Sequence, residues 1–175
     1  MFIVTADQRG STRTGNRVEE LLSWFETWQP RWVSAIALPL ERTVGDEVQT
    51  VLNDAEATVD LALALMRLEV WSVGIGAGDV EIPLADTSRA SAGAAFVHAR
   101  RAVERARGKG EPTPLVVGCD DPDAEGSATA VLQLLGAVVR KRSGPGWEVT
   151  DLEAQGLTQT QIAHRLGISA QAVSQ

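Results

Sequence analysis

Apolar positions along most of the chain follow two spacings. Short runs rich in β-branched residues predict strands at residues 2–6, 34–41, 47–52, 70–77 and 114–119. Apolar residues three and four positions apart predict a helix that starts near Thr14 or Asn16 and ends at Pro30. They also predict helices at residues 55–68, 92–106 and 120–142, the first of these capped by Asn53-Asp54. The order begins strand, helix, strand, strand, helix, strand, which is the split βαβ order of ferredoxin-like folds. We therefore expect an α+β fold, with helices packed on a ferredoxin-like βαββαβ sheet.

Three local features refine this sheet. Pro39 interrupts the strand at 34–41, so that strand is expected at an edge or a bulge, because proline cannot donate to a ladder. Gly74 and Gly76 lie inside the strand at 70–77 and predict close approach by another backbone or a ligand. The helix at 92–106 carries a narrow stripe of small apolar residues, which would let it lie close against the sheet.

Composition limits the class of protein. The chain has 175 residues, room for one main domain and a small appendage, and 44% of them are apolar, enough for a buried core. The formal charge of −7 argues against a nucleic-acid coat but leaves a local DNA-binding module open. Cys119 is the only cysteine, and we find no secretory signal or transmembrane run, so a cytoplasmic location is expected.

The glycine- and proline-rich residues 143–146 (SGPG) are the best candidate for a linker. They divide the sequence into an α/β domain at 1–142 and a helical tail at 147–175.

Two aspartates are candidates for one site. Asp7 directly follows the first strand, and Asp46 lies in the turn of the predicted hairpin. In a βαββαβ sheet the first strand and the hairpin are neighbours, so the two carboxylates could converge on Mg²⁺. The alternative is that Asp46 only shapes the turn. Residues 9–12 (RGST), placed before a helix, could supply N–H groups and hydroxyls to a phosphate.

Four segments carry a family resemblance. Residues 5–12 (TADQRGST) resemble the first metal-binding segment of class III nucleotide cyclases. Residues 42–47 (RTVGDE) resemble the second, and also the signature hairpin of diguanylate cyclase domains. Residues 72–80 and 91–102 are similar to the glycine-bearing strand and the helix that follow in those families. The resemblance covers about residues 1–110 and keeps the order of the four segments.

The resemblance implies a palm-like, cyclase-like domain with Mg²⁺ at Asp7 and Asp46. It also implies a nucleotide or phosphate site made of Arg9, Gly10, Ser11, Thr12, Arg42, Gly45, Glu47 and Arg101. The catalytic positions depart from the family pattern. Val97 stands where the cyclases carry an asparagine, and Arg42 where they carry a base-contacting lysine. Against the diguanylate cyclases, Val44 replaces a glycine and Val48 a phenylalanine. We therefore expect a domain without turnover.

The tail has the pattern of a helix-turn-helix. Residues 158–161 (TQTQ) form a capping box, with Thr158 as N-cap and Gln161 reaching back. Gly167 would supply a left-handed turn, and Ser169 would cap the next helix. The residues expected to point inward are Ile162, Ala163, Leu166, Ile168, Ala172 and Val173.

DNA contact is expected from exposed polar residues of this tail. The candidates are Thr158, Gln159, Arg165, Ser169, Gln171, Ser174 and Gln175. Arg165 is the only basic residue from Trp147 onward, so a homodimer reading two half-sites would be needed for useful affinity. The sequence ends about two turns into the second helix, and we expect that helix to be either truncated or degenerate.

Taken whole, the chain resembles the SatD family of bacterial proteins, in which a cyclase-like domain precedes a DNA-binding tail. The resemblance implies a DNA-binding transcription regulator with a sensor or dimerisation domain. Two alternatives stay open: an Mg²⁺-dependent nucleotide-binding or cyclase-like enzyme using Asp7 and Asp46, and an interaction module using neither site. His98 is expected to be a partly buried, hydrogen-bonded side chain rather than a catalytic base.

Overall fold

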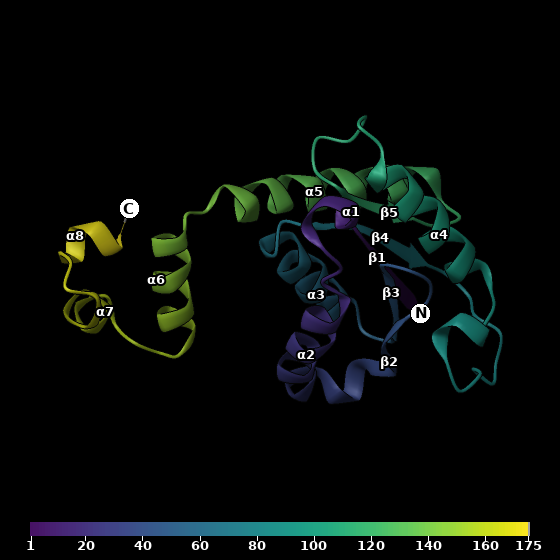
Figure 1. Cartoon of the computed structure of the whole chain (residues 1–175), viewed down its shortest axis with the longest axis horizontal. Helices are drawn as coiled ribbons and strands as arrows, with labels where there is room; N and C mark the ends of the chain where they lie inside the picture. Colours follow the sequence, from purple (N-terminus) through teal and green to yellow (C-terminus); the bar gives the residue numbers. More distant parts are fainter. Residues whose placement is uncertain (175) are drawn as a thin grey trace. The chain divides into compact units, whose positions relative to one another are not determined.

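A five-stranded mixed sheet organises the larger part of the chain. The computed structural model describes residues 1–174 and shows an α+β fold (Figure 1). The strands are β1 (Phe2–Gln8), β2 (Ile36–Arg42), β3 (Glu47–Leu52), β4 (Trp71–Ala77) and β5 (Leu115–Gly118). They lie in the order β2-β3-β1-β4-β5. Neighbouring strands are antiparallel except β4 and β5, which are parallel, so the whole sheet does not have a clear ferredoxin-like order.

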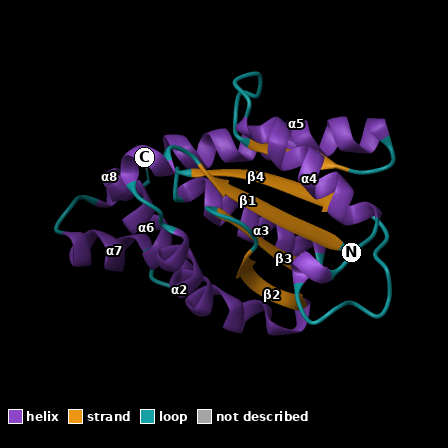
Figure 2. Ribbon diagram, turned by 45° about the vertical axis from the view of Figure 1, so that its right-hand side comes forward, coloured by secondary structure: helices purple, strands orange, loops and turns teal. Residues whose placement is uncertain are grey.

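Helices cover both faces of this sheet (Figure 2). In the larger unit they are α1 (Ser11–Thr14), α2 (Val18–Trp28), α3 (Ala55–Arg67), α4 (Ala94–Arg107) and α5 (Pro122–Lys141), with the 3₁₀ segments η1 (Gln29–Ala35) and η2 (Ser88–Ala90). The main core joins the sheet to α2, α3 and α5. Alternate residues of the strands pack on α4 instead, so α4 lies on the opposite face.

The close approach predicted at the two strand glycines is confirmed. A Cβ added to Gly74 would lie 2.2 Å from the backbone nitrogen of Val103, and one added to Gly76 would lie 2.0 Å from the carbonyl oxygen of Ala95. Neither distance is sterically possible, so α4 can rest on β4 only because these residues lack side chains. Ala95 and Ala99 on α4 are themselves fully buried against the sheet.

Other local predictions also hold. β2, which contains Pro39, is an edge strand, and its register against β3 shifts at two places. Asp54 caps α3 by accepting a hydrogen bond from the Ala57 N–H at 2.8 Å. The first long helix begins at Val18, two to four residues later than predicted. Asn16 Oδ1 accepts the Val18 N–H at 2.9 Å and so helps to fix that start.

The chain divides into two compact units, Met1–Arg140 and a second that begins at Lys141. The second unit contains α6 (Gly144–Ala154), α7 (Gln159–Leu166) and α8 (Ala170–Val173). Residues 143–146, predicted as a linker, instead form the N-cap and first turn of α6. The Ser143 hydroxyl accepts the Gly146 N–H at 3.3 Å, and Pro145 lies in the first turn, where proline is tolerated.

No helix in residues 1–174 is long and apolar enough to cross a bilayer.

Candidate functional site

The sheet brings the predicted acidic residues together, but in a different pairing. Strand β1 continues to Gln8, so Asp7 lies inside the strand rather than after it. The residue opposite Asp7 on β3 is Glu47, and both side chains belong to residues that are 6% exposed. Asp46 lies beside Glu47, is half-buried, and accepts the Gln8 N–H through its backbone oxygen at 3.2 Å. Residues 7 and 46 are therefore neighbours, with Glu47 as the cross-strand partner.

Two arginines of α4 neutralise this pair. Arg107 Nε lies 3.2 Å from Asp7 Oδ1, and Arg100 Nη1 lies 2.9 Å from Glu47 Oε2. The Thr43 hydroxyl donates to the other Glu47 oxygen, Oε1, at 2.7 Å. Arg100 and Arg107 are two helical turns apart on one flank of α4, so a single helix supplies both positive charges. This spacing was visible in the sequence, but nothing there indicated which strands the flank would face.

Burial dominates the electrostatics of Asp7. It raises the pKa of that carboxyl above its ordinary value of 3.8, because a buried charge loses its hydration. Arg107 opposes this shift by favouring the charged form. The negative charges of Asp46 and Glu47 raise the pKa further, and Arg100 lowers it. Asp7 is therefore held in an environment that costs free energy to ionise, despite its ion pair.

A third polar residue lies beside Asp7 on the next strand of the sheet. Ser72 on β4 is the partner of Asp7 on the side away from Glu47. It is 0% exposed, and among the described residues its hydroxyl oxygen has no hydrogen-bond partner. Ser72 alternates with Gly74 and Gly76, so it shares their face, the one under α4. We call Glu47, Asp7 and Ser72 the acidic row. The sequence carried one unused signal for Ser72, its two-residue spacing from Gly74.

The acidic row offers oxygen donors of the kind that Mg²⁺ prefers. In residues 1–174, however, no three metal-ligating His, Cys, Asp or Glu side chains converge as a metal cluster. The arginines fill the role that a cation would have, and the Arg107 side chain is 51% exposed, so it has room to move. A cation at Asp7 and Glu47 would have to displace Arg107. It would also give the Ser72 hydroxyl a partner.

The predicted phosphate loop ends in a single helical turn. Gly10 adopts a left-handed conformation with φ +74°, and its carbonyl accepts the N–H groups of Arg13 and Thr14. Ser11 and Thr12 open α1, which has only four residues. The side chain of Arg9 is exposed. So short a helix has little macrodipole, and the loop lacks the long helix that was expected to strengthen it.

Among the described residues, the other predicted nucleotide contacts form no side-chain hydrogen bond or ion pair with the acidic row. Arg42 Nη2 pairs with Glu19 Oε1 on α2 at 2.9 Å, and Gly45 forms the hairpin turn with φ +61°. Arg101 lines a hollow of about 100 Å³ beside β5. His98 lines the same hollow, is 7% exposed, and binds Asp120 Oδ1 through Nε2 at 2.9 Å. The prediction of a buried, hydrogen-bonded His98 is confirmed.

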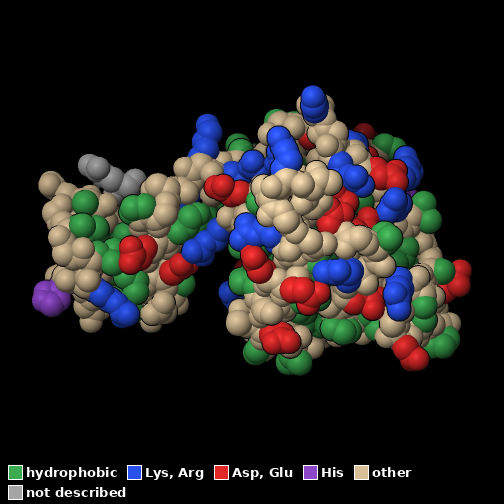
Figure 3. Space-filling model, viewed as in Figure 1, with side chains coloured by type: hydrophobic (Ala, Val, Ile, Leu, Met, Phe, Trp, Pro, Cys, Tyr) green, Lys and Arg blue, Asp and Glu red, His purple; other side chains and the backbone are tan. Residues whose placement is uncertain are grey.

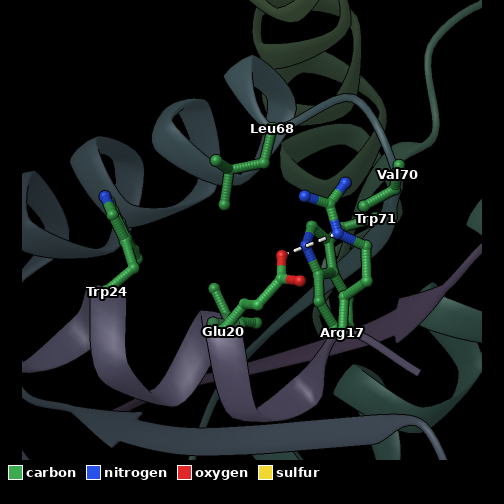
Figure 4. Close-up of a pocket in the computed structure, with 7 residues that line it drawn as sticks. Arg17, Glu20, Trp24, Leu68, Val70 and Trp71 are labelled. Atoms are coloured by element: carbon green, nitrogen blue, oxygen red, sulfur yellow. Dashed lines mark hydrogen bonds and ion pairs between the residues drawn. The ribbon is translucent and has the colours of Figure 1, made fainter. Parts of the chain in front are cut away.

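A larger hollow of about 210 Å³ lies between α2 and the turn leading into β4 (Figure 4). Arg17 and Glu20 form an ion pair of 2.8 Å at its edge, and Trp24, Leu68 and Trp71 are among its other lining residues. It contains none of the predicted site residues. Its volume is below the roughly 300–1,000 Å³ of typical small-molecule sites, so we assign it no ligand.

The turn geometry of the tail is confirmed. Thr158 Oγ1 accepts the Gln161 N–H, and the Gln161 side chain accepts the Thr158 N–H, which completes the capping box. Gly167 is left-handed with φ +67°, and the Ile168 N–H donates to the Ala163 oxygen at 3.1 Å. Ile162 and Ala163 are buried, as predicted.

Two of the inward positions predicted for the tail are wrong. Ile168 is 41% exposed, and Ala172 is exposed as well. Helix α8 spans only four residues, so it provides little surface to cover Ile168.

The predicted DNA contacts divide into caps and free side chains. The hydroxyls of Thr158 and Ser169 cap α7 and α8. Gln159, Arg165 and Gln171 are exposed, and the Ser174 hydroxyl donates to the Gln171 oxygen at 3.0 Å. Gln175 lies outside the described residues.

Charge differs between the two units. From Lys141 onward three basic residues balance three acidic ones, so the net charge of −7 belongs to the α/β unit. Figure 3 shows acidic and basic side chains interspersed over the visible face of that unit.

No protein-family model, curated protein or solved structure matches this chain. Its function is therefore inferred from its own residues.

Proposed function

We propose that this protein is a cytoplasmic, bacterial DNA-binding regulator of the SatD type. In this proposal α7 and α8 contact DNA, and the α/β unit is a non-catalytic sensor or dimerisation domain. The observation that carries the proposal is the pair α7 and α8, joined by the left-handed Gly167, with a complete capping box at the start of α7. A helix pair joined by a short glycine turn is the motif that places a second helix in the major groove.

The distribution of polar groups supports this use of the tail. Gln171 on α8 and Arg165 on α7 are exposed, and an amide and a guanidinium are groups that reach base edges and phosphates. The second unit is electrically neutral, whereas the α/β unit would repel a polyanion. With so few cations, one tail would bind weakly, and two tails in a dimer would bind far better.

The α/β unit supports a cyclase-like scaffold without turnover. Strands β2, β3, β1 and β4 are all antiparallel to their neighbours, which suits a split βαβ unit of the palm and ferredoxin-like kind, to which β5 is added. Arg100 and Arg107 occupy the surroundings of the carboxylates that a catalytic metal would need. We infer that they replace the metal and stabilise the fold.

DNA binding is tested by fluorescence polarisation with labelled duplexes selected from a random library at low salt. We expect Arg165→Ala to weaken binding and to reduce the slope of log K against log salt by about 1, as for one lost phosphate contact. Arg13→Ala, which removes an exposed arginine from α1, is the matched control and should leave binding unchanged. Equal losses in both variants, or no binding by the full chain, would rule out the tail as the DNA-contacting part.

A second candidate function is cation-dependent nucleotide binding at the acidic row. The specific observation in its favour is the buried Ser72 hydroxyl without a hydrogen-bond partner beside Asp7. Such a group is rare in a native interior, and a bound ion or an ordered water is one way to satisfy it.

Calorimetric titration with Mg²⁺, alone and with ATP or GTP, tests this candidate. Removing the competing charge with Arg107→Gln should strengthen Mg²⁺ binding, and Asp7→Asn should abolish it. If Mg²⁺ binds neither the parent chain nor Arg107→Gln, the acidic row is structural. If neither DNA nor nucleotide binds, the remaining interpretation is a protein-interaction module that uses neither site.

A further inference from the structure

Helix α5 is apolar on two opposite faces. Its inner face packs on the sheet through Leu132, which is 7% exposed, and through Thr129, whose hydroxyl accepts the Val117 N–H at 3.0 Å. Its outer face carries Val131, Leu134, Leu135 and Val138, which are 58%, 68%, 40% and 53% exposed. A helix that is apolar all round is normally buried all round, so this outer face lacks its cover.

The outer residues form one continuous stripe. Positions 131, 134, 135 and 138 fall within an arc of about 100° on a helix of 3.6 residues per turn. The small exposed residues Ala124 and Ser127 extend the stripe toward the N-terminal end. Residues 124, 127, 131, 134 and 138 alternate spacings of three and four, which is the seam that packs against another helix. We call these residues, with Leu135, the α5 seam.

Charge identifies the helix that fits the seam. The N-terminal end of α5 has exposed carboxylates at Asp121 and Asp123, and its C-terminal end has the exposed Lys141. A second copy running antiparallel would place each acidic end against the basic end of its partner. A parallel copy would place like charges together, which is unfavourable.

We propose that two copies of this chain pair through antiparallel α5 helices, about a two-fold axis that passes between positions 132 and 133. This register sets Val131 opposite the partner's Leu134, and Ser127 opposite the partner's Val138. It also sets Ala124 opposite the partner's Lys141, with Asp123 beside that lysine. The same patch serves both copies, as a two-fold interface requires. The pairing does not depend on DNA binding, and each can fail without the other.

The oligomeric state is the first test, by sedimentation equilibrium of the full chain across micromolar concentrations. Leu134→Glu places a charge in the centre of the seam and should weaken the dimer about 30-fold or more, as at a central interface residue. Val97→Glu is the matched control, because Val97 is an exposed valine of α4, at 59% exposure. It should leave the dimer intact. Equal circular dichroism spectra would show that both variants fold.

Disulfide trapping tests the direction and register. In a Cys119→Ser background, the double variant Ala124→Cys with Lys141→Cys should oxidise to a covalent dimer. Within one helix these positions are about 25 Å apart, far beyond the roughly 4.4–6.8 Å between the Cα atoms of a disulfide, so no internal bond can form. Ala124→Cys alone should remain monomeric on a denaturing gel, whereas a parallel pair would cross-link it.

Three results would overturn the proposal. One is a chain that stays monomeric at about 100 μM. Another is a dimer that survives Leu134→Glu. The third is efficient cross-linking of Ala124→Cys alone.

Discussion

The neighbours of Asp7 are determined by the register of its strand. The sequence placed it near the hairpin, and the sheet does so, yet its cross-strand partner is Glu47 rather than Asp46. A one-residue change of register exchanges the side chains on the two faces of a strand, and register depends on packing by distant elements. For the same reason the sequence could not reveal that Arg107, a hundred positions away, would reach Asp7.

Asp7→Asn should change the pH dependence of stability. Because the folded pKa of Asp7 is raised, the unfolded chain ionises first as pH rises above about 3.8. In that window the folded state holds the extra proton, so the free energy of unfolding falls with rising pH. The asparagine variant lacks this loss, and its stability relative to the parent should increase from pH 3.5 to pH 7. Urea denaturation at both pH values measures it, and a constant difference would contradict the raised pKa.

Asp60 is a second residue whose role follows from its partners. Its Oδ2 accepts the indole N–H groups of Trp28 at 2.8 Å and Trp32 at 3.0 Å. Asp60→Ala should cost about 2 kcal/mol, because the two donors lose their acceptor. Asp60→Asn keeps an acceptor oxygen and should cost less than half as much. Thermal unfolding compares them, and equal losses would show that the hydrogen bonds are not what stabilises this corner.

Helices and strands were predictable from the sequence where residues a few positions apart determine them. The hairpin strands, the Asp54 cap, α4 and the capping box of α7 all follow from spacing and cap residues within a few positions. The prediction failed at residues 143–146, where Gly and Pro were taken as a linker although Ser143 and Pro145 begin a helix. It failed again at Ile168, because exposure depends on how much helix follows.

The contact between α4 and β4 should be intolerant of any added side chain. Gly76→Ala would place a methyl group 2.0 Å from the Ala95 oxygen, so α4 would have to move. We expect a loss of about 3 kcal/mol or more, at the upper end for overpacking. Gly110→Ala, where nothing lies within 4 Å, should change stability by no more than about 0.5 kcal/mol. Urea midpoints of the two variants measure the difference, and a neutral Gly76→Ala would refute the close packing.

The cap of α7 is expected to act locally. Thr158→Ala should destabilise the start of that helix by about 1 kcal/mol, and Thr158→Ser should retain most of the stability. Hydrogen exchange of the α7 amides measures this effect. A loss of about 1 kcal/mol should raise their exchange rates roughly fivefold. Amides of the α/β unit should be unaffected, because they belong to a separate compact unit. Equal exchange rates in Thr158→Ala and the parent would show that the capping box does not stabilise the start of α7.

At the scale of the whole molecule, the two units differ in net charge and in exposed apolar surface. The α/β unit holds the net negative charge, the acidic row and the α5 seam, whereas the neutral tail presents α7 and α8. No sequence pattern predicted the α5 seam as exposed, since periodicity cannot tell which of two apolar faces the sheet will cover. In the function proposed above, these parts form one regulator that pairs through α5 and contacts DNA through the tail.

The most direct test of that account is a ¹H–¹⁵N titration of the full chain with a selected DNA duplex. The account predicts shifts confined to the amides and side chains of the tail, above all at Gln159, Arg165 and Gln171, with the strands of the sheet unmoved. Shifts centred on β1, β3 and α4, or no shifts at saturating DNA, would contradict it.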